Sequence, residues 1–164
     1  MTISHAYSTW IKPKGRRQND RGFPAWSITC RDLEQSIDFY ERLGLKVVKR
    51  IPDVREDGIA RAFKQTQANL TVAYLAPPHP ASKLFIDLVQ WLEPSAIGQA
   101  YPALNHVGLN RLAFRVRDID ATVSALREQA ISFLSQESQV FGPGIRSIVT
   151  NDPDGVFIQL IEGL

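Results

Sequence analysis

The chain has 164 residues, 44% of them hydrophobic, which is enough for one compact domain or for two half-domains that share a core. This composition excludes a disordered or fibrous protein. A single cysteine, Cys30, excludes an internal disulfide framework, and no apolar run approaches the roughly 20 residues needed to span a bilayer.

The net charge of +2 is distributed unevenly along the chain. Residues 1–22 hold five basic residues and one acidic residue, a net of +4, which leaves −2 for the remaining residues. A nucleic-acid-binding domain carries a basic face on its folded part, so we expect no nucleic-acid partner. We interpret residues 1–22 as a basic tail, with anion binding or subunit contact as alternatives. The chain shows no secretory signal and no membrane segment, which predicts a cytoplasmic protein.

An internal repeat organises the rest of the chain. The segment from Ala25, AWSITCRDLEQSIDFYERLGLKVVKR, aligns without gaps with the segment from Arg111, RLAFRVRDIDATVSALREQAISFLSQ. Apolar residues alternate at the start of each copy, and this period predicts a half-buried strand. Asp32 and Asp118 then stand where a helix N-cap is expected, and each is followed by an apolar stripe of helical period. Gly44 is predicted to end the first helix.

Three strand-like runs follow each predicted helix. They are LKVVKR, ANLTVAYLA and KLFIDLVQW in the first half, and ISFLSQ, RSIVTN and GVFIQLIEG in the second half. NDPDGV is predicted to be a turn before the last strand, because proline fixes φ and glycine permits a positive φ. We therefore expect a tail at 1–22, a first module at 23–93, a linker at 94–109 and a second module at 110–164.

A strand, a helix and three strands, repeated once, resemble the module of the vicinal oxygen chelate superfamily, which includes glyoxalases, bleomycin-resistance proteins and extradiol dioxygenases. The segments DLEQSIDFYERLGL and NDPDGVFIQLIE carry the resemblance, which extends over about residues 23–163. It implies an α+β fold of two βαβββ modules, whose mixed sheets curl into a cup with the helices on the outer face. It also implies a homodimer.

The resemblance further implies a divalent-metal site with one ligand from each of four strands. The corresponding positions are Ala25, Asp87, Arg111 and Gln159, and only Asp87 is a convincing ligand. Alanine has no donor atom, and the arginine guanidinium is cationic and has no lone pair to offer. We therefore predict no cofactor and no metal ligands, which argues against lactoylglutathione lyase and dioxygenase chemistry, since both need the metal.

Three residues are candidates for catalysis. Arg111 is expected to hold an anion in the cup, or to form a buried ion pair with Asp87. Asp87 could act as a general base if burial raises its pKa, or serve as a counter-charge if Arg111 lowers that pKa. His106, just before the second module, is a candidate acid or base because histidine titrates near neutrality.

Five further residues are candidates for ligand binding. Gln159 could orient a carbonyl or hydroxyl group, and Arg115 follows Arg111 on the same strand face. Tyr74, Phe85 and Phe157 could line an apolar pocket for a ring-bearing ligand or simply fill the core.

The leading hypothesis is a metal-independent protein that binds a largely apolar, anionic small molecule and turns it over by proton transfer, as an isomerase, epimerase, cyclase or lyase. The first alternative is a non-catalytic protein that sequesters a drug, similar to the bleomycin-resistance branch. The second alternative is a metal-dependent glyoxalase or dioxygenase that uses His106 and Asp87 with Glu93 or Glu162. Both glutamates follow strand ends and are expected to face solvent.

Overall fold

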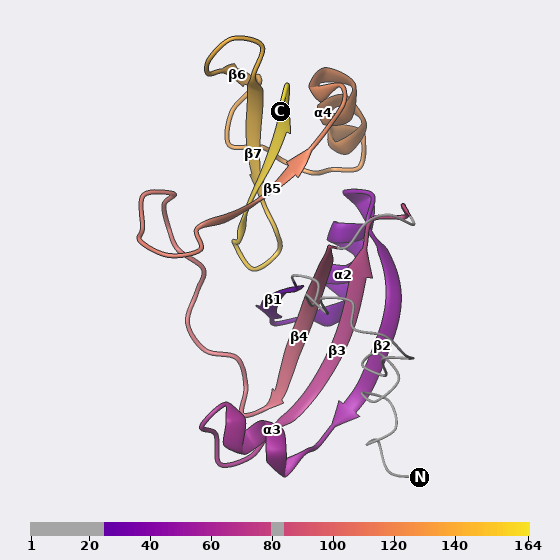
Figure 1. The fold of residues 1–164 in the computed structure, drawn as a ribbon, viewed down its shortest axis with the longest axis vertical. Coiled ribbons are helices and arrows are strands. Elements are labelled where there is room, and N and C mark those ends of the chain that lie inside the picture. The colour runs from indigo at the N-terminus through magenta and orange to yellow at the C-terminus, as the bar shows by residue number, and fades with distance from the viewer. Residues whose placement is uncertain (1–24, 80–83) are drawn as a thin grey trace, which may run out of the picture. The chain divides into compact units, whose positions relative to one another are not determined.

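The structure is a computed structural model that describes residues 25–79 and 84–164. The predicted tail at 1–22 lies outside the described residues. The chain divides into two units, each with its own four-stranded mixed sheet (Figure 1). Unit 1 comprises the described residues up to Leu33 and Leu45–Ala96, whereas unit 2 comprises Glu34–Gly44 and Ile97–Leu164. The α+β class with two repeated sheets is therefore confirmed.

The sheet of unit 1 has the strand order β1-β4-β3-β2. The strands β1 and β4 pair in parallel, and the other neighbouring strands pair antiparallel. The strands are β1 (Ala25–Cys30), β2 (Lys46–Val54), β3 (Asn69–Ala76) and β4 (Phe85–Glu93). All four coincide with predicted strand-like runs, although β2 continues to Val54, beyond the run LKVVKR.

The two faces of this sheet differ because successive strand residues point to opposite sides. One face buries aliphatic side chains and the lone cysteine: Ile28, Cys30, Ala73, Leu75, Ile86 and Leu88. The opposite face, which we call the Asp87 face, carries Ser27, Tyr74, Asp87, Val89 and Trp91. It combines apolar residues with the candidate carboxylate.

A short helix that the sequence patterns did not predict, α3 (Asp57–Ala62), joins β2 to β3 at one end of this sheet (Figure 1). Its residue Ile59 packs against a buried cluster of Ile51, Val54, Leu70 and Val72. Six residues are too few for the helical period to emerge from the sequence. We therefore attribute the formation of α3 to its packing against this cluster and not to a local sequence pattern.

The sheet of unit 2 repeats the arrangement in the order β5-β8-β7-β6. It consists of β5 (Arg111–Arg115), β6 (Gln139–Val140), β7 (Arg146–Asn151) and β8 (Phe157–Glu162). The helix α4 (Ile119–Glu128) buries Ile119, Val123 and Leu126, as its stripe predicts. Asp118 accepts a hydrogen bond from the Ala121 N–H at 2.9 Å and is the predicted N-cap.

One strand prediction is wrong. The run ISFLSQ, residues 131–136, is a loop in which the Leu134 N–H donates to the Val149 carbonyl. The fourth strand is β6, which has only two residues and lies further along the chain. Because ISFLSQ alternates only approximately, its pattern could not distinguish a strand from a loop that packs beside one.

The helix α2 (Leu33–Arg42) contributes a buried polar contact to unit 2. Tyr40 is fully buried, and its hydroxyl donates to Asp152 Oδ2 at 2.9 Å. The other oxygen of Asp152 accepts from the N–H groups of Asp154 and Val156, so it fixes the predicted turn before β8. Burial raises the pKa of Asp152, and these hydrogen bonds offset part of the rise.

The two helices that follow β1 and β5 receive equivalent contacts at their N-termini. The Leu33 N–H donates to Gln90 Oε1 at 3.1 Å, and the Ile119 N–H donates to Glu162 Oε2 at 2.6 Å. Gln90 lies within β4 and Glu162 is the last residue of β8, and each satisfies a helix N–H that has no partner within the helix. The expectation that Glu162 faces solvent is therefore wrong. Among the described residues, no helix has the length and apolar character required to cross a membrane.

We predict that Tyr40→Phe lowers the free energy of unfolding by about 1–3 kcal/mol, since it leaves the buried Asp152 carboxylate without one donor. Urea denaturation monitored by circular dichroism measures this change. Tyr101→Phe is the matched control, because the side chain of Tyr101 is 44% exposed and surface changes cost within about 0.5 kcal/mol. Equal stabilities of the two variants would contradict the contribution assigned to the Tyr40 hydroxyl.

Candidate functional site

Four polar side chains form one row across the Asp87 face of unit 1. Strand register places Lys49 beside Tyr74, Tyr74 beside Asp87, and Asp87 beside Ser27. Neighbouring strands lie about 4.8 Å apart, so adjacent members of this row are within reach of one another. The sequence identified Tyr74 and Asp87, whereas Lys49 and Ser27 emerge only from the strand pairing.

Asp87 has two carboxylate oxygens in different environments. Oδ2 accepts a hydrogen bond from the Ser27 hydroxyl at 2.8 Å. Oδ1 is buried and has no hydrogen-bond partner in the described part of the chain. Burial raises the pKa of Asp87, and the Ser27 hydrogen bond offsets only part of that rise. Within unit 1, desolvation is therefore the larger effect on this carboxyl group, and the predicted effect of Arg111 stays a prediction.

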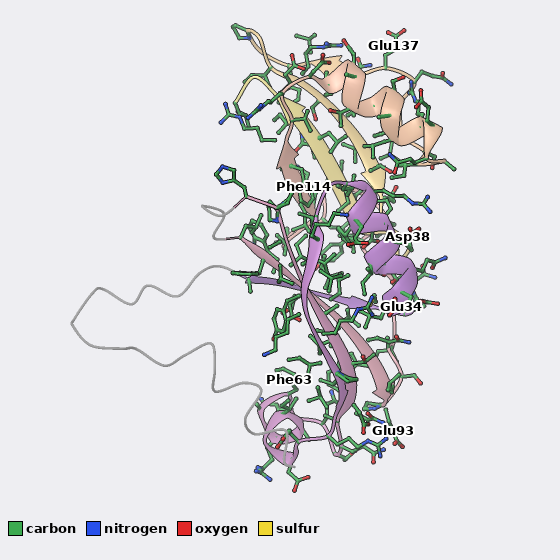
Figure 2. The ribbon with its side chains drawn as sticks, turned by 90° about the vertical axis from the view of Figure 1, so that its right-hand side faces the viewer. Glu34, Asp38, Phe63, Glu93, Phe114 and Glu137 are labelled. Carbon is green, nitrogen blue, oxygen red and sulfur yellow. The ribbon has the colours of Figure 1, made fainter. Side chains whose placement is uncertain are left out.

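Aromatic side chains continue the Asp87 face toward α3. Tyr74, Val89 and Trp91 pack against the buried cluster around Ile51 and Val72. Phe63 follows α3 directly (Figure 2), and its ring lies 6.0 Å from the ring of Trp91. Phe63 is 55% exposed and Trp91 is half-buried, so the pair is partly open to solvent. Phe85 is half-buried on the same face.

In unit 2, Arg111 and Gln159 are in direct contact. The Arg111 Nε donates to Gln159 Oε1 at 2.7 Å, and Arg111 Nη1 donates to Asn110 Oδ1 at 3.2 Å. Gln159 in turn donates through Nε2 to the Ser147 hydroxyl at 2.7 Å. The buried amide of Gln159 thus links a buried serine to an exposed guanidinium. The predicted ligand-binding role of Gln159 stays a prediction, but the structure identifies Arg111 as its partner.

The other candidates of unit 2 occupy different environments. Arg115 is exposed on the same strand face as Arg111, and Phe157 is buried beside Arg111 in the register of β5 and β8. His106 is exposed, and its ring stacks on that of Tyr101 at 5.4 Å. Asp87 belongs to unit 1 and Arg111 to unit 2, so the ion pair between them stays a prediction.

The residues at the four positions implied for metal ligands do not fit a divalent cation. Gln159 Oε1, the amide oxygen of the set, is occupied by the Arg111 N–H, and that guanidinium would repel a cation. Asp87 is then the one anionic donor, and one carboxylate does not hold a catalytic metal. No group of three histidine, cysteine, aspartate or glutamate residues is arranged for metal binding within residues 25–79 and 84–164.

The comparisons with known proteins agree with the repeated fold. Residues 22–160 match the family model described as Glyoxalase/Bleomycin resistance protein/Dioxygenase superfamily. No curated protein sequence matches the chain. A solved glyoxalase family protein from Bacillus cereus has a TM-score of 0.75 and 25% identity, and the match covers 94% of this chain and 98% of that chain.

Two further solved structures are similar in fold. TnmS3, an antibiotic binding protein from a Streptomyces species, has a TM-score of 0.59 and 21% identity, over 90% of this chain and 100% of that chain. The fosfomycin resistance protein FosX from Listeria monocytogenes, complexed with Mn(II) and sulfate, has a TM-score of 0.53 and 15% identity, over 88% and 93% of the two chains. Since the family model matches most of the sequence and both units carry its repeated sheet, the chain belongs to the Glyoxalase/Bleomycin resistance protein/Dioxygenase superfamily.

Proposed function

We propose that this protein binds a small, largely apolar anion without a metal ion, and that Arg111 holds the acid group of that ligand. The observation that carries the proposal is the environment of the Arg111 guanidinium. It is exposed, it is oriented by the side chains of Gln159 and Asn110, and it has no carboxylate partner within the described residues of unit 2. A guanidinium oriented in this way can bind an anion.

The two partners of Arg111 are neutral, and this distinguishes it from the arginines that pair with a carboxylate. Arg146, for example, forms two hydrogen bonds with Asp120, so its charge is compensated. The amide oxygens of Gln159 and Asn110 orient the guanidinium of Arg111 but do not compensate its positive charge. Its remaining N–H groups can then bind a carboxylate, enolate or phenolate by charge-assisted hydrogen bonds.

Binding of a small molecule agrees with the names of two relatives, one an antibiotic binding protein and the other a fosfomycin resistance protein. FosX is described with Mn(II), whereas the corresponding donor set of this chain, Ala25, Asp87, Arg111 and Gln159, does not fit a metal. We therefore assign recognition to Arg111 in place of a metal ion.

Turnover by proton transfer is the catalytic form of this proposal, with Asp87 as the proton acceptor. A carboxylate whose pKa is raised by burial accepts a proton more readily near neutral pH than an ordinary aspartate does. Oδ1 is the oxygen available for this step, because Ser27 occupies Oδ2. Isomerase, epimerase, cyclase and lyase reactions can each begin with such a transfer.

A second candidate function is non-catalytic sequestration of a ring-bearing drug. The solvent-exposed pair of Phe63 and Trp91 supports it, since aromatic faces bind planar ligands by stacking. With an identified ligand, Asp87→Asn and His106→Gln separate the two functions. An enzyme would lose turnover and retain affinity, whereas a sequestering protein would show no turnover to lose.

To test the proposed anion site, we predict that Arg111→Gln weakens binding of the probe biphenyl-4-carboxylate by about tenfold or more, because a charge-assisted hydrogen bond is lost. Isothermal titration calorimetry at low and moderate salt measures the dissociation constant. The matched control is Arg127→Gln, which removes the same charge from α4 and should change affinity by less than about twofold. Equal affinities of wild type and Arg111→Gln would contradict the proposed function.

We predict that untagged protein retains far less than about one metal ion per chain after incubation with Mn²⁺, Fe²⁺, Ni²⁺ or Zn²⁺ and desalting. Elemental analysis of the desalted protein measures the ratio, and Asp87→Ala treated in parallel gives the background. Retention of one ion per chain in wild type but not in Asp87→Ala would overturn metal-independent binding.

The raised pKa of Asp87 predicts a definite dependence of stability on pH. Above this pKa the Asp87 carboxylate is charged, and burial of that charge lowers the free energy of unfolding. As pH falls toward the ordinary pKa of 3.8, the folded state takes up the proton before the unfolded state does, and this destabilisation disappears. Wild type should therefore gain stability relative to Asp87→Asn between pH 7 and 4, by at most about 1.4 kcal/mol per pH unit. Urea denaturation at a series of pH values measures this difference.

Asp120 supplies a control of opposite sign. Its hydrogen bond from Arg146 lowers its pKa, so its stabilising contribution is present above 3.8 and is lost as pH falls through the lowered value. Wild type should lose stability relative to Asp120→Asn below about pH 4. If Asp87→Asn behaved like Asp120→Asn, the protonation state assigned to Asp87 would be wrong.

A further inference from the structure

The edge strand β5, which carries the exposed Arg111, also carries a second exposed arginine, Arg115, four residues further along. Side chains on a strand alternate between the two faces, so Arg111, Ala113 and Arg115 share one face. A rise of about 3.3 Å per residue places the two arginine Cα atoms roughly 13 Å apart. β5 is an edge strand of its sheet, and both arginine side chains are exposed.

The rest of this face, which we call the Arg111 face, is uncharged. The residues that β7 and β8 contribute to it by register are Ser147, Val149, Asn151, Phe157, Gln159 and Ile161. The acidic residue of these strands, Glu162, has the opposite parity and accepts from the Ile119 N–H. The Arg111 face therefore presents two positive charges and no negative charge.

On the opposite face of the same sheet, the arginine is paired with a carboxylate. Arg146 pairs with both oxygens of Asp120 on α4, at 2.7 and 2.6 Å, and also donates to Ser138. Arg115, by contrast, has no carboxylate partner in the described part of the chain. Packing of unit 2 does not account for an arginine at position 115, whereas a ligand with an acid group would.

The space between the two arginines is suited to an extended spacer. Ala113 lies between them and is exposed, so only a methyl group stands above the strand at this point. With the two Cα atoms roughly 13 Å apart, each guanidinium can receive its own acid group.

Resting on the proposed function of Arg111, we infer that the ligand is an elongated dianion, with one acid group at Arg111, an apolar spacer over Ala113 and a second acid group at Arg115. This chemistry describes a rigid dicarboxylate or a molecule with an acid group at each end. It narrows the ligand class beyond a small apolar anion.

The test uses a matched pair of probes, biphenyl-4,4′-dicarboxylate and biphenyl-4-carboxylate, which share a spacer and differ by one acid group. Isothermal titration calorimetry measures both dissociation constants for wild type, Arg115→Gln, Arg111→Gln and Arg127→Gln. Arg127 lies on α4 and contacts the ring of Phe133, and it therefore controls for the loss of one charge away from the Arg111 face. Circular dichroism confirms that each variant is folded.

We expect wild type to bind the dicarboxylate about tenfold more tightly than the monocarboxylate. Arg115→Gln should abolish this preference and leave monocarboxylate affinity within about twofold of wild type, and Arg127→Gln should retain the preference. If Arg115→Gln retained the preference while Arg111→Gln weakened both probes, the dianion inference would fail and the proposed anion site would stand. If Arg111→Gln weakened neither probe, the proposed function would fail, and the inference with it.

Discussion

Parallel pairing of the first and last strands of each module is the constraint on which the candidate site depends. In unit 1 it places Ser27 opposite Asp87, and in unit 2 it places Ala113 opposite Gln159. Antiparallel neighbours could be joined by a tight turn, but a parallel pair needs intervening chain, which here includes a helix. The helices of both modules begin soon after β1 and β5, and β4 and β8 supply the acceptors for their first N–H groups. The parallel pairing therefore positions both the helix start and the serine beside Asp87, whereas the antiparallel strands add Tyr74 and Lys49 to the row.

Equivalent positions of the two modules now carry different chemistry. Burial raises the pKa of Asp87, and the hydrogen bond from the Ser27 hydroxyl offsets only part of that rise. Gln159, its counterpart in unit 2, cannot titrate and instead orients Arg111. An arginine side chain has no lone pair to offer a metal and carries a positive charge. Arg111 is therefore the residue on which the proposed anion binding depends.

The arginines of unit 2 differ in their partners according to strand parity. Arg146 is compensated by Asp120 on the face that carries α4. Arg111 and Arg115 stand on the other face, to which β7 and β8 contribute only neutral residues. The anion binding that we propose would use the charges of these two arginines.

The sequence by itself determined the repeat, the α+β class, seven of the eight described strands and the helices α2 and α4, because strand and helix periods are local properties. It also determined the strand positions of Asp87, Arg111 and Gln159. Only the tertiary structure decided the contacts of those residues. The bond between Tyr40 and Asp152 spans 112 positions, and the serine beside Asp87 lies 60 positions away. The helix α3 and the loop at 131–136 were also beyond local patterns, since packing overrides propensity in short segments. The rise in the pKa of Asp87 likewise depends on burial, which is a property of the folded chain and not of its sequence spacing.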